Sequence, residues 1–372
     1  MMNFHVPKTT LAQTYRHGLE TALAAANFLG HPTLPLVQAF TIFVALVRRQ
    51  EHPRYVWMLT GLAIRMGQSL GLHRDGSQLG LLGAHEIEMR RRVWWILCML
   101  DVRTAEDQGT EFAIGRDSFD TQMPRNINVD DDDCQDRPGL TDMTLPRIFI
   151  KVTEVTRRMM ATRGPKDPAP TIEQQGRILK ELDRLLEEDL LPYPQQLSTA
   201  TTIVRLVKAK LTIFISLPVL FTAATATTDT DTEELRTRLL TSSIEVAEYN
   251  HVLNEECRNW RWIAQTYTYW YAVVYMLMEI GRPDREWDGM LERAWDALQS
   301  PWLMQTERMT DDGIWFPLRR LMARARKRRE SLLPTLPHID FQLDLTSGEV
   351  DEIDWYGWVE SVQGIEREFD VL

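Results

Sequence analysis

The acidic run at residues 130–136 is the stretch whose residue types and spacing come nearest to a catalytic metal site. Asp132, Asp133 and Asp136 follow the pattern Asp-Asp-x-x-Asp, whose first and last carboxylates share one face if the segment is helical. Oxygen-only ligands of this kind suit Mg²⁺, which proteins usually bind through one or two carboxylates together with substrate phosphates. The spacing therefore raises magnesium–diphosphate chemistry as one hypothesis.

The surroundings of this acidic run argue against an enzyme. The pattern resembles the diphosphate motif of terpene synthases, which lies on a helix, but here it follows Pro-Arg-Asn-Ile-Asn and precedes Arg-Pro-Gly. The sequence contains no second metal motif with spaced Asn/Asp, Ser/Thr and Glu, no Gly-x-Ser-x-Gly and no phosphate-binding glycine loop. We therefore expect no catalytic residue, metal or cofactor. An all-α, magnesium-dependent, terpene-synthase-like enzyme using Asp132-Asp133-x-x-Asp136 is the alternative.

The segment from Trp57 to Asp133 organises the chain. Its first part predicts an amphipathic helix, because apolar residues recur three or four positions apart, at Leu59, Leu62, Ala63, Met66 and Leu70. Gly71 is expected to end this helix in the left-handed conformation. The polar corner that follows, His73-Arg74-Asp75, is interpreted as a hydrogen-bonded junction between two helices, with effector binding as the other interpretation.

A second helix is predicted to begin near Glu86 and Glu88, since acidic side chains favour a helix N-terminus. Its buried face is predicted to comprise Val93, Trp94, Ile96, Leu97 and Leu100, with Trp94 packed against the Leu59–Leu70 face. Asp101 lies on the same stripe, so we expect it to have a buried partner such as an arginine. The three arginines at 90–92 point in different directions around a helix. We expect them to be solvated or ion-paired, with Arg91 at the surface.

The ordered motifs of this segment resemble the regulatory domain of fungal-specific transcription factors, the middle homology region downstream of a binuclear zinc cluster. They are Gly61-Leu62-Ala63-Ile64-Arg65-Met66, Gly71-Leu72-His73-Arg74-Asp75, Arg90-Arg91-Arg92-Val93-Trp94-Trp95, Asp101, Gly115-Arg116, and Pro124-x-Asn126 with Asp131 and Asp133. The resemblance extends more weakly from about residue 10 to about residue 330. It implies an all-helical domain, a nuclear protein and transcriptional control. The regulatory-motif residues are taken to be Arg65, His73, Arg74, Asp75, Arg91, Trp94 and Asp101.

The cysteines separate this sequence from the DNA-binding part of that family. A binuclear zinc cluster needs six cysteines close together, whereas the chain has Cys98, Cys134 and Cys257, far apart, and no basic linker or heptad pattern ahead of Leu34. The net charge of −11 argues against a general affinity for phosphate backbones. We therefore expect no direct DNA binding from this chain alone. Zinc and DNA binding enter at family level only, through a missing N-terminal zinc cluster or a partner.

The rest of the sequence predicts an irregular all-α fold of about ten helices. The further segments expected to be helical are 10–30, 34–49, 145–163, 171–190, 201–223, 233–257, 285–299 and 312–329. Residues 201–223 are rich in β-branched side chains, but their length favours a buried helix kinked near Pro218. Aromatic residues at 260–275 are expected to be core and not a ligand pocket. The apolar runs fall short of the roughly 20 residues that a membrane span needs, and the N-terminus has no signal-peptide pattern.

The composition changes near the C-terminus. A basic run, interpreted as a nuclear localisation signal or as a helix end that complements its dipole, contains Arg319, Arg320, Arg324, Arg326, Lys327, Arg328 and Arg329. Residues 340–372 then hold ten acidic side chains and one basic one, with aromatic residues among them. Such a segment is either an activation segment or a tail that folds back onto the domain. We expect a regulatory domain at 1–330 and an acidic, aromatic arm at 331–372.

The sequence as a whole predicts a transcription regulator of a fungal nucleus. Its expected partners are the transcription machinery or a zinc-cluster protein, and a small-molecule effector is compatible with the family. No membrane association is expected.

Overall fold

The computed structural model describes residues 8–48, 51–80, 82–115, 117–131, 134–160, 172–185, 187–188, 198–222, 229–256, 270–300 and 312–332. Within these ranges the regular structure is helical, which confirms the predicted all-α class. The chain divides into two compact units, unit 1 at residues 1–165 and unit 2 at residues 166–372. The division into a domain at 1–330 and an arm at 331–372 stays a prediction.

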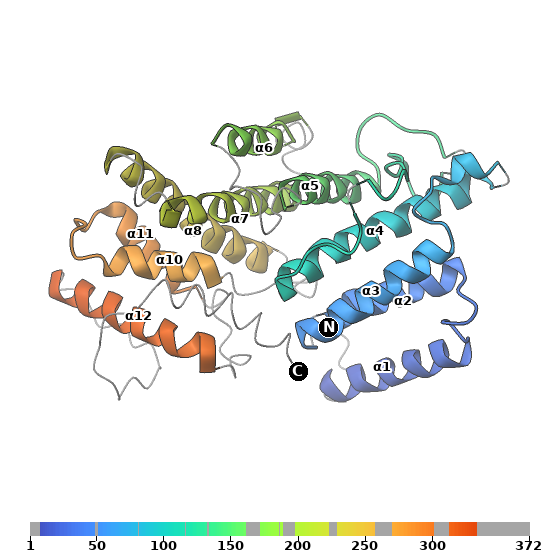
Figure 1. The fold of residues 1–372 in the computed structure, drawn as a ribbon, viewed down its shortest axis with the longest axis horizontal. Coiled ribbons are helices and arrows are strands. Elements are labelled where there is room, and N and C mark those ends of the chain that lie inside the picture. Colours follow the sequence, from blue (N-terminus) through green and yellow to red (C-terminus); the bar gives the residue numbers. More distant parts are fainter. Residues whose placement is uncertain are drawn as a thin grey trace. The chain divides into compact units, whose positions relative to one another are not determined.

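Unit 1 is built around one long helix. Its elements are α1 (Lys8–Ala25), α2 (Leu34–Val47), α3 (Pro53–Ser69), the 3-10 turn η1 (Gly76–Leu79), α4 (Ala84–Gln108) and α5 (Thr144–Met160). α4 packs against α2, α3 and α5, and it is buried on several sides (Figure 1). The core of this unit joins Val37, Phe40 and Val44 of α2 to Ala63 of α3 and Trp94 of α4.

Gly71 ends α3 as predicted, in the left-handed conformation with φ of +69°. The Gly71 N–H donates to the Gln68 carbonyl at 2.9 Å, and the Leu72 N–H donates to the Gly67 carbonyl at 3.0 Å. These two bonds form a Schellman motif, which satisfies carbonyls at the helix end and turns the chain sharply. Leu72, which is fully buried, anchors the turn in the core. The corner of residues 73–75 is therefore held in place by α3 itself.

The predicted buried faces are partly right. Ala63 and Met66 of α3 are buried, but Leu59, Leu62 and Leu70 are only partly buried at the edge of the core. The other buried residues of this helix are Val56, Thr60, Ile64 and Gly67. A side chain at Gly67 would bring its Cβ to 2.7 Å from the Leu97 Cδ1 atom, so glycine allows the two helices to approach closely. In α4 the prediction for Ile96 is wrong, since it is 44% exposed. Trp95 is buried instead.

Unit 2 consists of α6 (Ile172–Leu185), α7 (Ser198–Thr222), α8 (Asp229–Glu256), α10 (Trp270–Gly281), α11 (Gly289–Leu298) and α12 (Asp312–Leu332). α7 packs along α8, and α10 contacts α8, α11 and α12 (Figure 1). The expected helix at 201–223 is confirmed, and it continues past Pro218. Every residue from Ala272 to Leu277 is buried, so α10 is the central helix of this core.

A buried glutamate joins three elements of unit 2. Glu279 of α10 is 1% exposed, and its carboxylate lies 3.0 Å from Arg236 Nη1 of α8. It also lies 2.9 Å from Arg285 Nη1 and 3.4 Å from Arg282 Nη1, both in the segment before α11. The Tyr275 hydroxyl is 3.3 Å away. This network offsets the cost of burying the charge and fixes α8, α10 and the start of α11 together.

Several predicted features lie outside the described residues. They are the capping residue Thr171, residues 260–269 of the aromatic segment 260–275, Arg116, Asp132, Asp133, Cys257 and the acidic arm. Of the aromatic residues expected to be core, Tyr275 is 1% exposed but Tyr271 is 51% exposed. In the described part of the chain, none of the helices combines the length and apolar character that crossing a membrane requires.

Candidate functional site

A buried ion pair joins the polar corner to α4. Asp75 is fully buried at the N-cap of η1, and Arg91 binds both of its oxygens, with Nε–Oδ2 and Nη2–Oδ1 distances of 2.8 Å each. The Ser77 N–H (3.1 Å) and hydroxyl (2.6 Å) donate to Oδ1, and the Gln122 N–H (2.9 Å) donates to Oδ2. Burial raises the pKa of Asp75, but the hydrogen bonds from Arg91 and Ser77 outweigh it, so the pKa lies well below its usual range. Asp75 is therefore a charged carboxylate inside unit 1.

The segment after α4, residues 110–122, is named the strap. The strap's C-terminal end is fixed to the α3–α4 corner and to α4 by further hydrogen bonds besides those of Asp75. The Thr121 hydroxyl donates to the Leu72 carbonyl at 2.7 Å, and the Trp95 indole N–H donates to the Gln122 carbonyl at 3.0 Å. The Arg91 Nη2 atom is 2.8 Å from Gln122 Oε1. The corner, α4 and the strap thus form one hydrogen-bonded unit.

A second buried carboxylate holds the other end of the strap. Asp101 of α4 is 3% exposed, and its two oxygens accept from the Ala113 and Ile114 N–H groups at 2.9 Å each. The expected arginine partner is Arg157 of α5, whose Nη1 lies 3.4 Å from Asp101 Oδ2 and whose Nη2 donates to the Ile114 carbonyl at 2.6 Å. Burial raises the pKa of Asp101 despite these opposing contacts. The prediction of a buried partner is confirmed.

Aromatic rings fill the space between the two carboxylates. Phe119 of the strap packs edge-on against Trp94 and Trp95, with ring centroids 5.6 Å apart in each pair, and the Arg157 guanidinium lies 5.8 Å from its centroid. The His73 ring is 5.9 Å from the Trp94 ring. Burial and the neighbouring Arg74 charge lower the pKa of His73, so its ring stays neutral at neutral pH. The strap is thus packed on the core as well as hydrogen-bonded to it.

Two of the predicted motif residues lie at the surface. Arg65 of α3 is exposed, and its Nη1 is 3.1 Å from Gln68 Oε1 on the same helix. Arg74 is also exposed, with Nη1 3.1 Å from Asp120 Oδ2 of the strap. Asp120 accepts the Asp75 N–H at 2.8 Å through its other oxygen. The structure therefore brings five of the seven motif residues together inside unit 1, and Arg74 meets the strap from outside.

The expectation that Arg91 is a surface residue is wrong. Its side chain is 4% exposed, and it is the member of the arginine triplet that reaches Asp75. Of its two neighbours, Arg90 is also buried and Arg92 is partly buried. Arg92 Nε is 3.0 Å from Glu88 Oε1, and Arg90 Nη2 donates to the Leu70 carbonyl at 2.5 Å. All three arginines are therefore engaged, and they do point in different directions, as the helical spacing predicts.

The Pro124-x-Asn126 motif organises the loop that follows the strap. The Asn126 side-chain amide donates to the Arg137 and Gly139 carbonyls at 2.9 Å each. Its carbonyl oxygen accepts from the Thr141 hydroxyl at 2.8 Å and from the Thr144 hydroxyl at 3.0 Å. One asparagine thus joins both ends of the loop to the start of α5. Asp131 forms an ion pair within the same loop, with its Oδ2 atom 2.6 Å from Arg137 Nε.

The magnesium-site hypothesis finds no support. Asp132 and Asp133 lie outside the described residues, but Asp136 lies in a loop, where it accepts the Asn126 N–H at 2.5 Å and lies 3.7 Å from Arg147 Nη1. Among the described residues no group of three or more His, Cys, Asp or Glu side chains could hold a metal ion. The oxygens of Asp75 and Asp101 already accept from nearby donors, so these buried carboxylates are structural acceptors in this arrangement.

The basic run occupies α12, and its members differ in exposure. Exposed are Arg319, Arg324 and Lys327, and partly buried are Arg320, Arg326, Arg328 and Arg329. Arg328 Nη1 donates to the Ile280 carbonyl at 2.6 Å, and its other amino group donates to the Arg285 carbonyl. Arg329 Nη2 is 2.8 Å from Glu292 of α11. Arg328 and Arg329 therefore hold α12 in place, and only part of the run is available to a receptor.

Sequence reasoning missed three residues of the strap's attachment: Phe119, Gln122 and Arg157. Each contributes through partners at least 24 positions away in the chain, such as Asp101, which lies 56 positions before Arg157. The one usable signal was Asp101 itself, because a buried carboxylate demands a cation or several N–H donors. That argument predicts the type of partner but not its position.

Replacing Asp101 by asparagine is expected to destabilise unit 1 by about 1–3 kcal/mol, because the amide has one acceptor for two buried N–H donors. The effect also depends on pH. Since the pKa of Asp101 is raised in the folded state, the wild-type chain loses stability as the pH rises from the unfolded to the folded pKa, and the variant has no such loss. The difference in unfolding free energy between the wild-type chain and Asp101→Asn, measured by urea unfolding, should therefore narrow as the pH increases. A difference that widens would contradict the raised pKa.

Comparison with known families gives a match that covers most of unit 1 and the beginning of unit 2. The model of the fungal specific transcription factor domain matches residues 4–205. The C6 finger domain transcription factor hasF of Aspergillus fumigatus is 35% identical over 154 residues, which cover 39% of this chain and 20% of that protein. The aurofusarin cluster transcription factor aurR2 of Gibberella zeae is 34% identical over 199 residues, covering 50% of this chain and 29% of that protein.

A third relative is the pyriculol/pyriculariol biosynthesis cluster transcription factor 1 of Pyricularia oryzae, 31% identical over 160 residues that cover 41% of this chain and 21% of that protein. The chain thus matches between a fifth and three tenths of the length of these three relatives. No solved structure matches it.

Proposed function

Because this chain belongs to the fungal-specific transcription factor domain family, we propose that it is the regulatory domain of a transcription regulator acting in a fungal nucleus. The observation that carries the proposal is the family match over residues 4–205, which includes the corner, α4 and the strap. The names of the relatives, all transcription factors, support it. The alternative of a terpene-synthase-like enzyme has no comparable support.

We propose that the zinc cluster that binds DNA belongs to another part of the regulator or to a partner protein. Two similar proteins are named C6 finger domain transcription factors, and this sequence holds three dispersed cysteines. Cys98 and Cys134 are both buried, and burial raises the pKa of Cys98 to about 12, which disfavours the thiolate that zinc requires. The proposed role of this chain is therefore to control, through protein contacts, a DNA-binding module supplied from elsewhere.

Fusing residues 1–372 to a DNA-binding module of known specificity should change the output of a reporter gene that carries its site. The unfused chain should leave the same reporter unchanged, because it has no zinc ligands in cluster spacing and carries a net charge of −11. A fusion that is nuclear and folded but gives the same output as the DNA-binding module alone would refute the regulatory proposal. A response to the unfused chain would instead reveal DNA binding by the chain itself.

Nuclear import is proposed to depend on the exposed part of the basic run. Changing Arg319, Arg324 and Lys327 to alanine should move a fluorescent fusion of the chain from the nucleus to the cytoplasm without unfolding it, because these side chains are exposed on α12. Arg328 and Arg329 are left unchanged, since removing them would also remove tertiary hydrogen bonds.

The matched control changes three exposed cations elsewhere, Arg54, Arg177 and Lys180, to alanine, which removes the same charge. The control should remain nuclear. If both triple variants move to the cytoplasm together, total charge and not the α12 run directs import. If neither moves, the run has a structural role only.

A further inference from the structure

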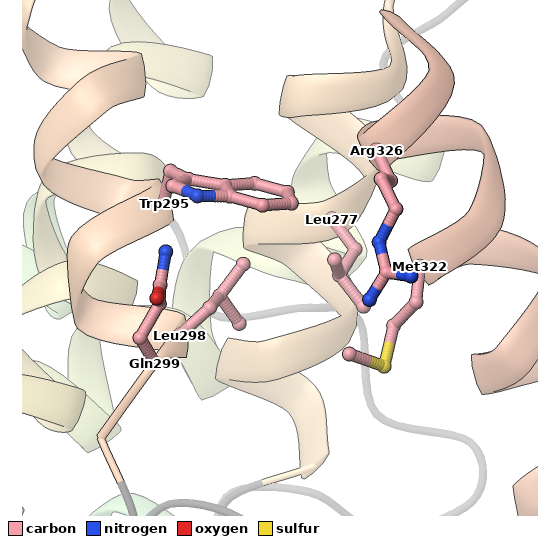
Figure 2. Close-up of a pocket in the computed structure, with 6 residues that line it drawn as sticks. All are labelled: Leu277, Trp295, Leu298, Gln299, Met322 and Arg326. Atoms are coloured by element: carbon pink, nitrogen blue, oxygen red, sulfur yellow. The ribbon is translucent and has the colours of Figure 1, made fainter. Parts of the chain in front are cut away.

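The gap between α10, α11 and α12 is too small to hold a ligand. Leu277, Trp295 and Met322 are among the residues that line it (Figure 2), and it has room for only about one water molecule. Small-molecule sites usually enclose roughly 300–1,000 Å³. Among the described residues, the feature that points to a further binding role is instead an exposed helix face in unit 1.

One face of α3 combines exposed apolar side chains with cations. Its residues, which we name the outer face of α3, lie three or four positions apart along the helix and are Arg54, Trp57, Met58, Gly61 and Arg65. Trp57 is 39% exposed and Met58 is 62% exposed, and both arginines are exposed as well. Tryptophan, methionine and arginine are enriched in protein–protein interfaces relative to the rest of a protein surface. The composition of this face is therefore typical of a surface that binds another protein.

Gly61 leaves a gap in the middle of the outer face. Glycine is unfavourable in a helix interior, because it loses more conformational freedom on folding than other residues. A Cβ atom at Gly61 would have no neighbour within 4 Å beyond the helix itself, so the packing of unit 1 does not require glycine there. Gly67 differs, since its Cβ would lie 2.7 Å from the Leu97 Cδ1 atom of α4. The gap at Gly61 gives a large side chain of a partner access to the backbone of α3.

The two arginines of the outer face have no carboxylate partner among the described residues. Arg65 Nη1 lies 3.1 Å from Gln68 Oε1, and no ion pair involves the Arg54 side chain in the described part of the chain. Other arginines of unit 1 are paired, such as Arg48 and Arg91, which lie 2.9 Å and 2.8 Å from carboxylate oxygens. Arg54 and Arg65 are separated by about 16 Å along the helix axis. A partner with acidic groups at that separation would supply both missing carboxylates.

We propose that the outer face of α3 binds an amphipathic helix of a partner protein. The apolar stripe of that helix lies on Trp57 and Met58, one of its large side chains fills the gap at Gly61, and carboxylates at the two ends of the stripe meet Arg54 and Arg65. Helices bind protein surfaces in this way through apolar residues at three- and four-residue spacing. The same face of a second copy is disfavoured, because it would bring two more arginines and no carboxylate.

This docking goes beyond the proposed regulatory function and does not rest on it. The argument for the docking depends only on the outer face of α3, whereas the regulatory function depends on the family match. The reporter experiment and a binding experiment can therefore fail independently of each other.

Fluorescence anisotropy of a labelled helical peptide, titrated with the full chain, tests the docking. The peptide carries leucines along one face and a glutamate near each end of that face, about 16 Å apart. Trp57→Ala should weaken binding at least about tenfold, because tryptophan is a typical hot-spot residue of interfaces. Arg65→Glu should weaken it about five- to tenfold, and less so at high salt. Arg238→Glu, the same charge reversal at an exposed position of α8, is the control and should leave binding unchanged.

Gly61→Gln separates binding from folding. Glutamine is a better helix former than glycine, so this variant should melt at a higher temperature than the wild-type chain. It should nevertheless bind the peptide about tenfold more weakly, because its side chain fills the gap and disrupts the shape match. Gly18→Gln is the matched control, since Gly18 is exposed in α1 and its Cβ would also have no neighbour within 4 Å. That variant should gain stability and bind the peptide normally.

Several results would overturn the proposal. The first is that the wild-type chain does not bind the peptide, and the second is that the wild type, Trp57→Ala and Gly61→Gln bind it equally well. A dimer on gel filtration that Trp57→Ala dissociates would assign the outer face to a second copy. Binding to vesicles of phosphatidylserine and phosphatidylcholine that Trp57→Ala abolishes would assign it to a lipid surface. Either assignment would replace the partner helix as the occupant of this face.

Discussion

Replacing Arg91 by alanine is expected to lower the unfolding free energy of unit 1 by about 3–5 kcal/mol, because it leaves the buried Asp75 carboxylate without its bidentate partner. Both side chains are less than 5% exposed, so water cannot replace the arginine without opening the corner. Urea unfolding of the full chain, followed by far-UV circular dichroism, measures the loss. Arg65→Ala is the matched control on exposed α3 surface, and it should cost no more than about 0.5 kcal/mol.

The same pair predicts a dependence on pH. In the wild-type chain the pKa of Asp75 is lowered, so its contribution to stability is present above the unfolded pKa and is lost as the pH falls through the folded value. Without Arg91, burial is expected to raise the pKa of Asp75. The variant should therefore lose most unfolding free energy when the carboxylate is charged. The stability difference should therefore be largest near neutral pH and narrow in acid. A difference that is independent of pH would show that Arg91 acts through packing alone.

The double variant Asp75→Ala/Arg91→Ala separates the pair from its surroundings. If the cost of Arg91→Ala comes mainly from the abandoned charge, the double variant should be less unstable than the sum of the two single variants. Purely additive costs would mean that each side chain is held by its other contacts, such as those to Ser77 and Gln122. The cycle thus measures the coupling between α4 and the corner directly.

Trp94→Ala is the other change expected to be severe, with a loss of about 3–5 kcal/mol or no soluble protein. Trp94 is fully buried and contacts the rings of His73 and Phe119, so its removal leaves a cavity between the corner, α4 and the strap. Trp94→Phe should cost less than half as much, because it keeps a ring in that space. It also removes an indole N–H that finds no hydrogen-bond partner among the described residues.

Trp57→Ala serves as the control for the loss of a tryptophan. Trp57 is 39% exposed on α3, and its truncation should cost about 1 kcal/mol or less. Equal melting temperatures for Trp57→Ala and Trp94→Ala would show that the inward face of α4 is wrongly assigned. Thermal unfolding followed at two wavelengths gives the comparison directly.

Local patterns in the sequence determined the elements of this protein. Apolar periodicity predicted the helices of both units, and Gly71 predicted the end of α3, because both signals depend on residues within one or two turns. The need of Asp101 for a buried cation was also foreseeable, since an isolated charge in a core is costly. The family resemblance lay in such local motifs, and the match over residues 4–205 confirms it.

Only the tertiary structure decided which polar residues are paired. Helical spacing shows that three consecutive arginines diverge, but it does not show which of them faces a carboxylate 16 residues earlier. Ile96 and Trp95 exchange their expected roles for the same reason: the strap covers the side of α4 that carries Trp95. The burial of a charge or a large ring is set by the segments that return to cover it. Those contacts join residues far apart in the chain, so the spacing of residues within one helix cannot predict them.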